Sequence, residues 1–210
     1  MNSENQNKIG AGKLSRFERI EKVPLLKMLL YLSMAGMGVL FFILIFIFLS
    51  DLGQLPPGKS IALPKLFSVS TVLLLVSGFF MHQVPDFYKQ DDLVRMNRRL
   101  LGALSLGVLF TVAQVVAWYE LTTQQVFFKG QTIGTFLYLL SALHLLHVAG
   151  GLAFLAFLFL KNNRASKDPI RTLVFIRDPF RKMQLEMLRS YWHFLDAVWI
   201  GLYFVFLFAL

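Results

Sequence analysis

The longest uncharged stretch of the chain, residues 130–160, reads GQTIGTFLYLLSALHLLHVAGGLAFLAFLFL. As a helix that rises about 1.5 Å per residue, it is long enough to cross a hydrocarbon core about 30 Å thick. Four other runs are also long enough, and Asp196 is the one charge within them. Helix is the expected form because isolated strands leave backbone groups unpaired in lipid. We therefore predict an all-α, multi-pass integral membrane helix bundle with five transmembrane helices, at about 28–50, 66–84, 100–118, 133–160 and 191–210.

The composition excludes several classes of protein. Hydrophobic residues make up 56% of the 210 and charged residues 16%, whereas soluble domains carry roughly 25% charged residues. A soluble single domain is therefore excluded, as is a nucleic-acid-binding protein in spite of the net charge of +9. The residues outside the five runs are too few for a large extramembrane catalytic domain. The chain has no cysteine, which rules out disulfides, iron–sulfur clusters and thiolate chemistry.

The basic residues divide unequally between the two sides of the predicted bundle. The polar tail at 1–27 and the loops at 85–99 and 161–189 together carry 18 Lys and Arg, and the other two loops carry 3. Cytoplasmic segments of membrane proteins are enriched in these residues. We therefore expect the N-terminus in the cytoplasm and the C-terminus outside, in a bacterial cytoplasmic (inner) membrane.

The loop at 161–189 contains two Asp-Pro pairs, at 168–169 and 178–179. Asp at the cap followed by Pro at the first helical position is typical of a helix start. We expect a short surface helix from Pro169 and a second helix from Pro179 that runs directly into the last span.

Polar side chains inside the spans are the candidate functional positions, since a buried Asp costs about 2.5–3.5 kcal/mol in lipid. His193 and Asp196 lie about 60° apart on a helix and can pair with each other or with neighbouring helices. Trp199 and Tyr203 continue the same stripe. A proton relay or ligand site is one interpretation of these four residues. A structural polar clasp near the inner interface is the interpretation we favour.

The third and fourth spans offer further candidates. His144 and His147 share a face of the fourth span and can bind a metal together with a third ligand. They can bind a haem if His82 or His193 lies opposite one of them. We favour hydrogen bonds between helices for both, and we expect the same role for Gln114 in the third span.

Three segments match one protein family in order and spacing over about residues 66–210. They are WHFLDAVW at 192–199 followed by Tyr203, HLLHVAGG at 144–151, and LGVLF at 106–110 with Gln114 and Tyr119-Glu120. The first string resembles the signature of the last helix of subunit III of the haem–copper oxidases. The other two are similar to the helices that precede it in that family, and the Trp-His-Phe-x-Asp-x-Val-Trp pattern is the most specific of the three.

The resemblance implies cytochrome c oxidase subunit III in its short five-helix bacterial form, a non-catalytic subunit of a proton-pumping terminal respiratory oxidase. Family members hold no redox centre, so haem and copper are expected in partner subunits and bound phospholipid in this chain. The subunit is expected to stabilise the catalytic subunit I, to associate with subunit II, and to support proton uptake during oxygen reduction. A larger respiratory supercomplex is a further partner that the resemblance allows. No catalytic, cofactor-binding or metal residue is expected here, and the polar, lipid-contact or subunit-contact candidates are Gln114, His144, His147, His193, Asp196, Trp199 and Tyr203.

The sequence departs from the family in its length and in two carboxylates. Longer members have seven spans, so this chain resembles a form without the first two. Many members carry a carboxylate in the helix that matches 28–50 and another three residues after the glutamine, whereas this chain has no acid in that helix and Ala117 at the second position. Direct proton donation from these positions is therefore not expected.

Two alternatives stay open at the level of the sequence. Subunit III of a quinol oxidase is the nearer one, and cytochrome c is preferred as electron donor because it is more frequent in the family. A haem-binding membrane cytochrome that uses His144 or His147 with His82 or His193 is the more distant one. Five unbroken spans disfavour a transporter, in which broken helices and inverted repeats are expected.

Overall fold

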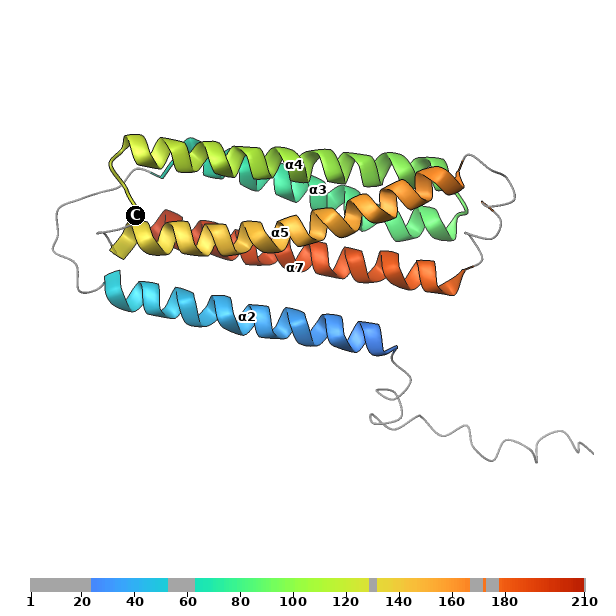
Figure 1. The fold of residues 1–210 in the computed structure, drawn as a ribbon, viewed down its shortest axis with the longest axis horizontal. Coiled ribbons are helices and arrows are strands. Elements are labelled where there is room, and N and C mark those ends of the chain that lie inside the picture. The colour runs from blue at the N-terminus through green and yellow to red at the C-terminus, as the bar shows by residue number, and fades with distance from the viewer. Residues whose placement is uncertain (1–23, 53–62, 129–131, 167–171, 173–177, 210) are drawn as a thin grey trace, which may run out of the picture.

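The computed structural model describes residues 24–52, 63–128, 132–166, 172 and 178–209. Within these ranges the chain forms five long helices and no strand (Figure 1). The helices are α2 (Leu25–Leu52), α3 (Lys65–Lys89), α4 (Leu93–Thr123), α5 (Thr132–Ala165) and α7 (Pro179–Ala209). Each is long and apolar enough to cross a membrane. The predicted all-α bundle with five transmembrane helices is therefore confirmed.

α4 begins earlier than its uncharged run, at Leu93 rather than near residue 100. The Asp92 side chain caps the helix, because it accepts the backbone N–H of Arg95 at 2.8 Å. The uncharged run thus marks the part of α4 that suits lipid, and the helix continues beyond it into charged residues.

α7 begins at Pro179 and continues without a break through the last span, as the second Asp-Pro pair predicted. Asp178 starts this helix, since its Oδ1 accepts the backbone N–H of Phe180 at 2.9 Å. The helix expected from Pro169 lies outside the described residues, as does most of the tail at 1–27.

The helices pack around α7, which contacts α2, α3 and α5. α3 and α4 form an antiparallel hairpin, and Asp91 in its short turn has a left-handed φ of 57°, a conformation that Asp tolerates better than most residues. α2 packs against α5 and α7 at the side of the bundle away from α3 and α4 (Figure 1). One end of the bundle holds the starts of α2 and α7, the α3–α4 turn and the end of α5 (Figure 1). We call it the basic end, because the described residues there include Lys27, Arg99 and Lys182.

The core consists of two clusters of large side chains, and α7 contributes to both. Nearer the basic end, Met81 and Trp192 are fully buried in one cluster. Toward the other end, Trp199 stacks on Phe67 with ring centroids 5.8 Å apart and meets Phe110 edge-on at 5.1 Å. The residues that the sequence singles out on α7 therefore lie in the centre of the bundle.

Candidate functional site

Asp196 is the acid at the centre of the candidate site. It lies on α7 with 7% of its surface exposed, and its Oδ2 lies 3.4 Å from Nδ1 of His193, one turn earlier. Gly78 of α3 faces it, and a Cβ on Gly78 would overlap Asp196 Oδ2. The glycine therefore provides the space in which the carboxylate lies. The other oxygen, Oδ1, has no hydrogen-bond partner among the described residues.

A second imidazole extends this pair toward the surface of the bundle. His82 of α3 is exposed, and its ring centroid lies 5.5 Å from that of His193. The His193 side chain is 41% exposed, but its Nε2 is enclosed and has no hydrogen-bond partner in the described part of the chain. We call His82, His193 and Asp196 the α3–α7 polar row, since they run from the outside of α3 to the interior.

Trp199 and Tyr203 continue along α7 and bind α3. Trp199 Nε1 donates a hydrogen bond to Thr71 Oγ1 at 2.9 Å. The hydroxyl oxygens of Tyr203 and Ser68 lie 2.9 Å apart. Together with Asp196 these residues place a line of polar contacts along the α3–α7 interface.

Gln114 joins α4 to α3 in the same half of the bundle as Trp199. It is fully buried, and its Nε2 donates to Ser70 Oγ at 2.8 Å. Ser70 in turn donates to the carbonyl oxygen of Phe67 at 2.9 Å. The interhelical hydrogen bond expected for Gln114 is thus present.

The two histidines of α5 lie in different surroundings. His144 is fully buried, and its ring stacks on Trp199 at a centroid distance of 5.1 Å and meets Phe110 edge-on at 5.9 Å. Neither of its ring nitrogens has a hydrogen-bond partner among the residues described. His147 instead places Nδ1 2.7 Å from the carbonyl oxygen of Leu143 in its own helix. The rings around His144 leave no open face for a flat cofactor. In the described ranges, no three His, Cys, Asp or Glu side chains are placed to bind a metal.

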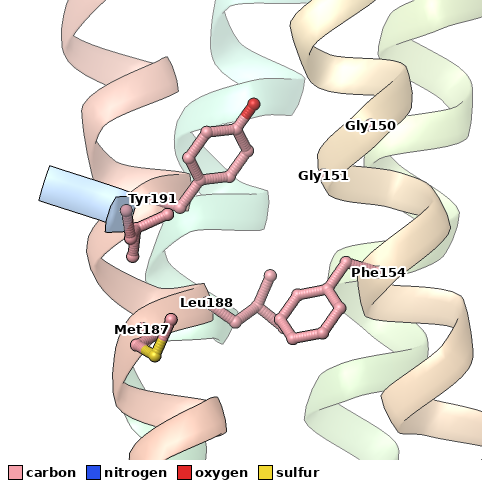
Figure 2. Close-up of a pocket in the computed structure, with 7 residues that line it drawn as sticks. Gly150, Gly151, Phe154, Met187, Leu188 and Tyr191 are labelled. Atoms are coloured by element: carbon pink, nitrogen blue, oxygen red, sulfur yellow. The ribbon is translucent and has the colours of Figure 1, made fainter. Parts of the chain in front are cut away.

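A cavity of about 220 Å³ lies between α2, α5 and α7 (Figure 2). Most of its lining is apolar, and the residues that line it are Leu30, Gly150, Gly151, Phe154, Met187, Leu188 and Tyr191. Gly150 leaves space beside it, because a Cβ there would meet nothing within 4 Å. The Tyr191 hydroxyl is already bonded, since it donates to the carbonyl oxygen of His147 at 3.1 Å.

A second hollow of about 510 Å³ lies nearer the basic end, between the starts of α2 and α7. Its polar lining includes Lys182 and the ion pair between Lys27 Nζ and Glu186 Oε2, which are 3.2 Å apart. The two hollows follow one another along the α2–α7 contact, because Lys27 and Leu30 are one helical turn apart. We call this pair of hollows the α2–α7 seam.

Relatives of known name identify the family. No family model matches the chain. A protein named probable cytochrome c oxidase subunit 3 from Nocardia farcinica is 30% identical to it over 151 residues, which cover 72% of this chain and 70% of that protein. The chain belongs to the cytochrome c oxidase subunit 3 family. A protein of the same name from Mycobacterium leprae is 28% identical over 154 residues, 73% of this chain and 70% of the relative. Cytochrome c oxidase subunit 3 of Lemur catta is 29% identical over 135 residues, which cover 64% of this chain and 44% of that relative.

The family predicted from the WHFLDAVW, HLLHVAGG and LGVLF segments is therefore confirmed. Sequence reasoning did not identify the partners that α3 supplies to the site, Gly78 and Thr71, nor the Lys182 side of the α2–α7 seam. One signal was present, because Ser77 and Gly78 are adjacent small residues in an apolar helix, and such residues mark close helix contacts in membranes. For Thr71 and Lys182 the sequence carries no comparable signal.

Proposed function

We propose that the chain is a non-catalytic subunit of a proton-pumping cytochrome c oxidase in a bacterial inner membrane, packed beside subunit I. Haem and copper then lie in partner subunits, and oxygen is reduced there. The observation that carries this proposal is the use of the polar side chains: Trp199 and Gln114 bond to α3, and Asp196 lies against Gly78 of α3. These groups join helices instead of converging on an open site. The names of the relatives support cytochrome c rather than quinol as the electron donor.

Lipid binding is the second part of the proposal, and the α2–α7 seam supports it. The apolar cavity beside Gly150 suits an acyl chain, and Lys182 at the basic end suits an anionic headgroup. Lys27 is already paired with Glu186, which leaves Lys182 as the cation for a phosphate. A phospholipid in this position would fill the space between α2 and the rest of the bundle and would hold α2 in place.

Support of proton uptake is the third part. With the N-terminus in the cytoplasm, as the 18 basic residues on one side suggest, the basic end faces the cytoplasm. His82 is exposed toward that end, and histidine binds and releases protons near neutral pH. Residues 28–50 contain no acid, base or histidine. Any contribution to proton uptake therefore comes from α3 and α7 rather than from α2.

Purification of the oxidase through a tag on this chain, followed by native mass spectrometry, tests the proposal. We expect the chain together with a haem-containing subunit I, subunit II and anionic phospholipid. Recovery of the chain alone, or with stoichiometric haem bound to it, would contradict the proposed role. Lys182→Gln should reduce the retained anionic lipid, whereas Lys161→Gln at the end of α5 is the matched control and should leave the lipid content unchanged.

The proposed orientation can be tested separately, because the chain has no cysteine of its own. Ser60→Cys and Ser166→Cys each introduce one thiol, on opposite predicted sides of the membrane. A membrane-impermeant maleimide added from the periplasmic side should label the first variant and leave the second unlabelled. Labelling of Ser166→Cys would overturn the orientation.

A further inference from the structure

An outward-facing stripe of α7 combines small side chains with an imidazole. His193, Ala197 and Gly201 follow one another at intervals of four residues and therefore share one face of the helix. Ala197 and Gly201 are both exposed, and a Cβ on Gly201 would meet nothing within 4 Å. We call these three residues the α7 stripe. No described side chain of this subunit covers Gly201.

The polar groups beside the stripe lack hydrogen-bond partners within the described ranges. His193 Nε2 and Asp196 Oδ1 have none, and exposed His82 lies with its ring centroid 5.5 Å from that of His193. Other polar side chains on the spans bond to their own helix: Ser105 donates to the Gly102 carbonyl oxygen at 3.0 Å, for example. Acyl chains of lipid offer no hydrogen-bond acceptor or donor. The α7 stripe and His82 therefore form a face that needs a polar neighbour.

We propose that the α7 stripe, flanked by His82, is the seat of a transmembrane helix from a neighbouring oxidase subunit, and that this helix carries a hydrogen-bonding side chain opposite the two imidazoles. The inference rests on the proposed function, since it names the face of the chain that meets the rest of the oxidase. Small residues allow two membrane helices to approach closely, and polar side chains then bond between them. Ala197 and Gly201 supply the first condition, and His82 with His193 supplies the second.

Gly201→Leu tests the close approach. Because the position is open within this subunit, the larger side chain should leave the subunit's own fold intact and obstruct only the incoming helix. We expect the share of the chain retained when the oxidase is purified through subunit I to fall by about threefold to tenfold. Gly36→Leu on α2 is the matched control, since a Cβ there also meets nothing within 4 Å, and it should be retained like the unmodified chain.

His82→Leu tests the polar half of the seat. Loss of one hydrogen bond between membrane helices should lower retention by about threefold to tenfold. Phe79→Leu changes an exposed apolar residue one turn away on the same helix, and it should have no such effect. A cysteine at Ala197, coupled to a short photocrosslinker, should join the chain to a partner subunit in the intact oxidase, whereas one at exposed Leu146 on α5 should not.

Retention of Gly201→Leu at the normal level, or crosslinks from Leu146→Cys but not from Ala197→Cys, would overturn the inference and leave the proposed function standing. Crosslinks from Ala197→Cys to lipid alone would overturn it as well. Failure of the unmodified chain to copurify with subunit I would overturn the proposed function itself.

Discussion

α2 and α3 both cross the membrane, but they are held in the bundle in opposite ways. α2 is the most apolar and the least buried of the five described helices, and its Leu32 and Phe46 are 71% and 64% exposed. α3 is less apolar, and it buries Ser70 and Thr71 in hydrogen bonds with α4 and α7. Polar residues in this chain therefore lie where other helices surround them. The α3–α7 interface, rather than α2, should determine how well the subunit holds together.

Gly78→Ala should give the largest loss of stability, because it acts at the centre of the α3–α7 interface. The added Cβ overlaps Asp196 Oδ2, so either the carboxylate leaves His193 or the two helices move apart. Overpacking of this kind costs about 1–3 kcal/mol. Thermal unfolding of the subunit within the purified oxidase would measure the loss.

Gly36→Ala is the matched control for this change, because α2 leaves open space beside Gly36. It should change the free energy of unfolding by less than about 0.5 kcal/mol. Equal losses in the two variants would show that α2 and α3 do not differ in the way described above.

Asp196→Leu and His193→Leu should come next in size. They remove polar contacts between α7 and its neighbours, each worth roughly 0.6–2 kcal/mol in a membrane. We expect a lower amount of assembled complex and little change in turnover per assembled complex. Quantitative subunit analysis together with oxygen consumption separates the two effects. Normal assembly with abolished turnover would assign these residues a catalytic role.

Trp199→Phe should have a smaller effect, because it keeps an aromatic ring in place of the indole and removes the hydrogen bond from Nε1 to Thr71. We expect a loss of about 0.6–1.7 kcal/mol. Thr71→Val removes the acceptor of the same bond. If the bond is responsible, the double variant should lose less than the sum of the two single losses, and strict additivity would exclude this explanation.

The fold follows from the sequence more completely than the site does. The uncharged runs locate five helices because a membrane span needs about twenty apolar residues in a row. The three-residue spacing of His193 and Asp196 predicts their contact, since it is fixed within one helix. Their neighbours on α3, Gly78 and Thr71, depend on how α3 is rotated about its axis against α7. Spacing within a single helix carries no information about that rotation.

The smallest expected effect lies outside the spans, at the start of α4. The backbone N–H of Arg95, followed by its guanidinium, holds the pKa of the Asp92 carboxyl below its ordinary value. A carboxyl whose pKa is lowered by folding stabilises the folded state above its unfolded pKa and loses this contribution as the pH falls through its folded pKa. The start of α4 should therefore be insensitive to pH between about 5 and 8 and should fray below about pH 4. Hydrogen exchange at Arg95 would measure this, and fraying near neutral pH would contradict it.

The central claim is that this subunit supports the chemistry of a neighbouring subunit without holding a redox centre of its own. The most direct test is the haem content and the initial rate of oxygen consumption of the oxidase purified from cells that lack this chain. We predict a full complement of haem, a nearly unchanged optical spectrum and initial oxygen reduction, followed by slower proton uptake and a shorter working life. Loss of haem while the catalytic subunit is still present and folded would contradict the claim, because it would place the cofactor in this chain.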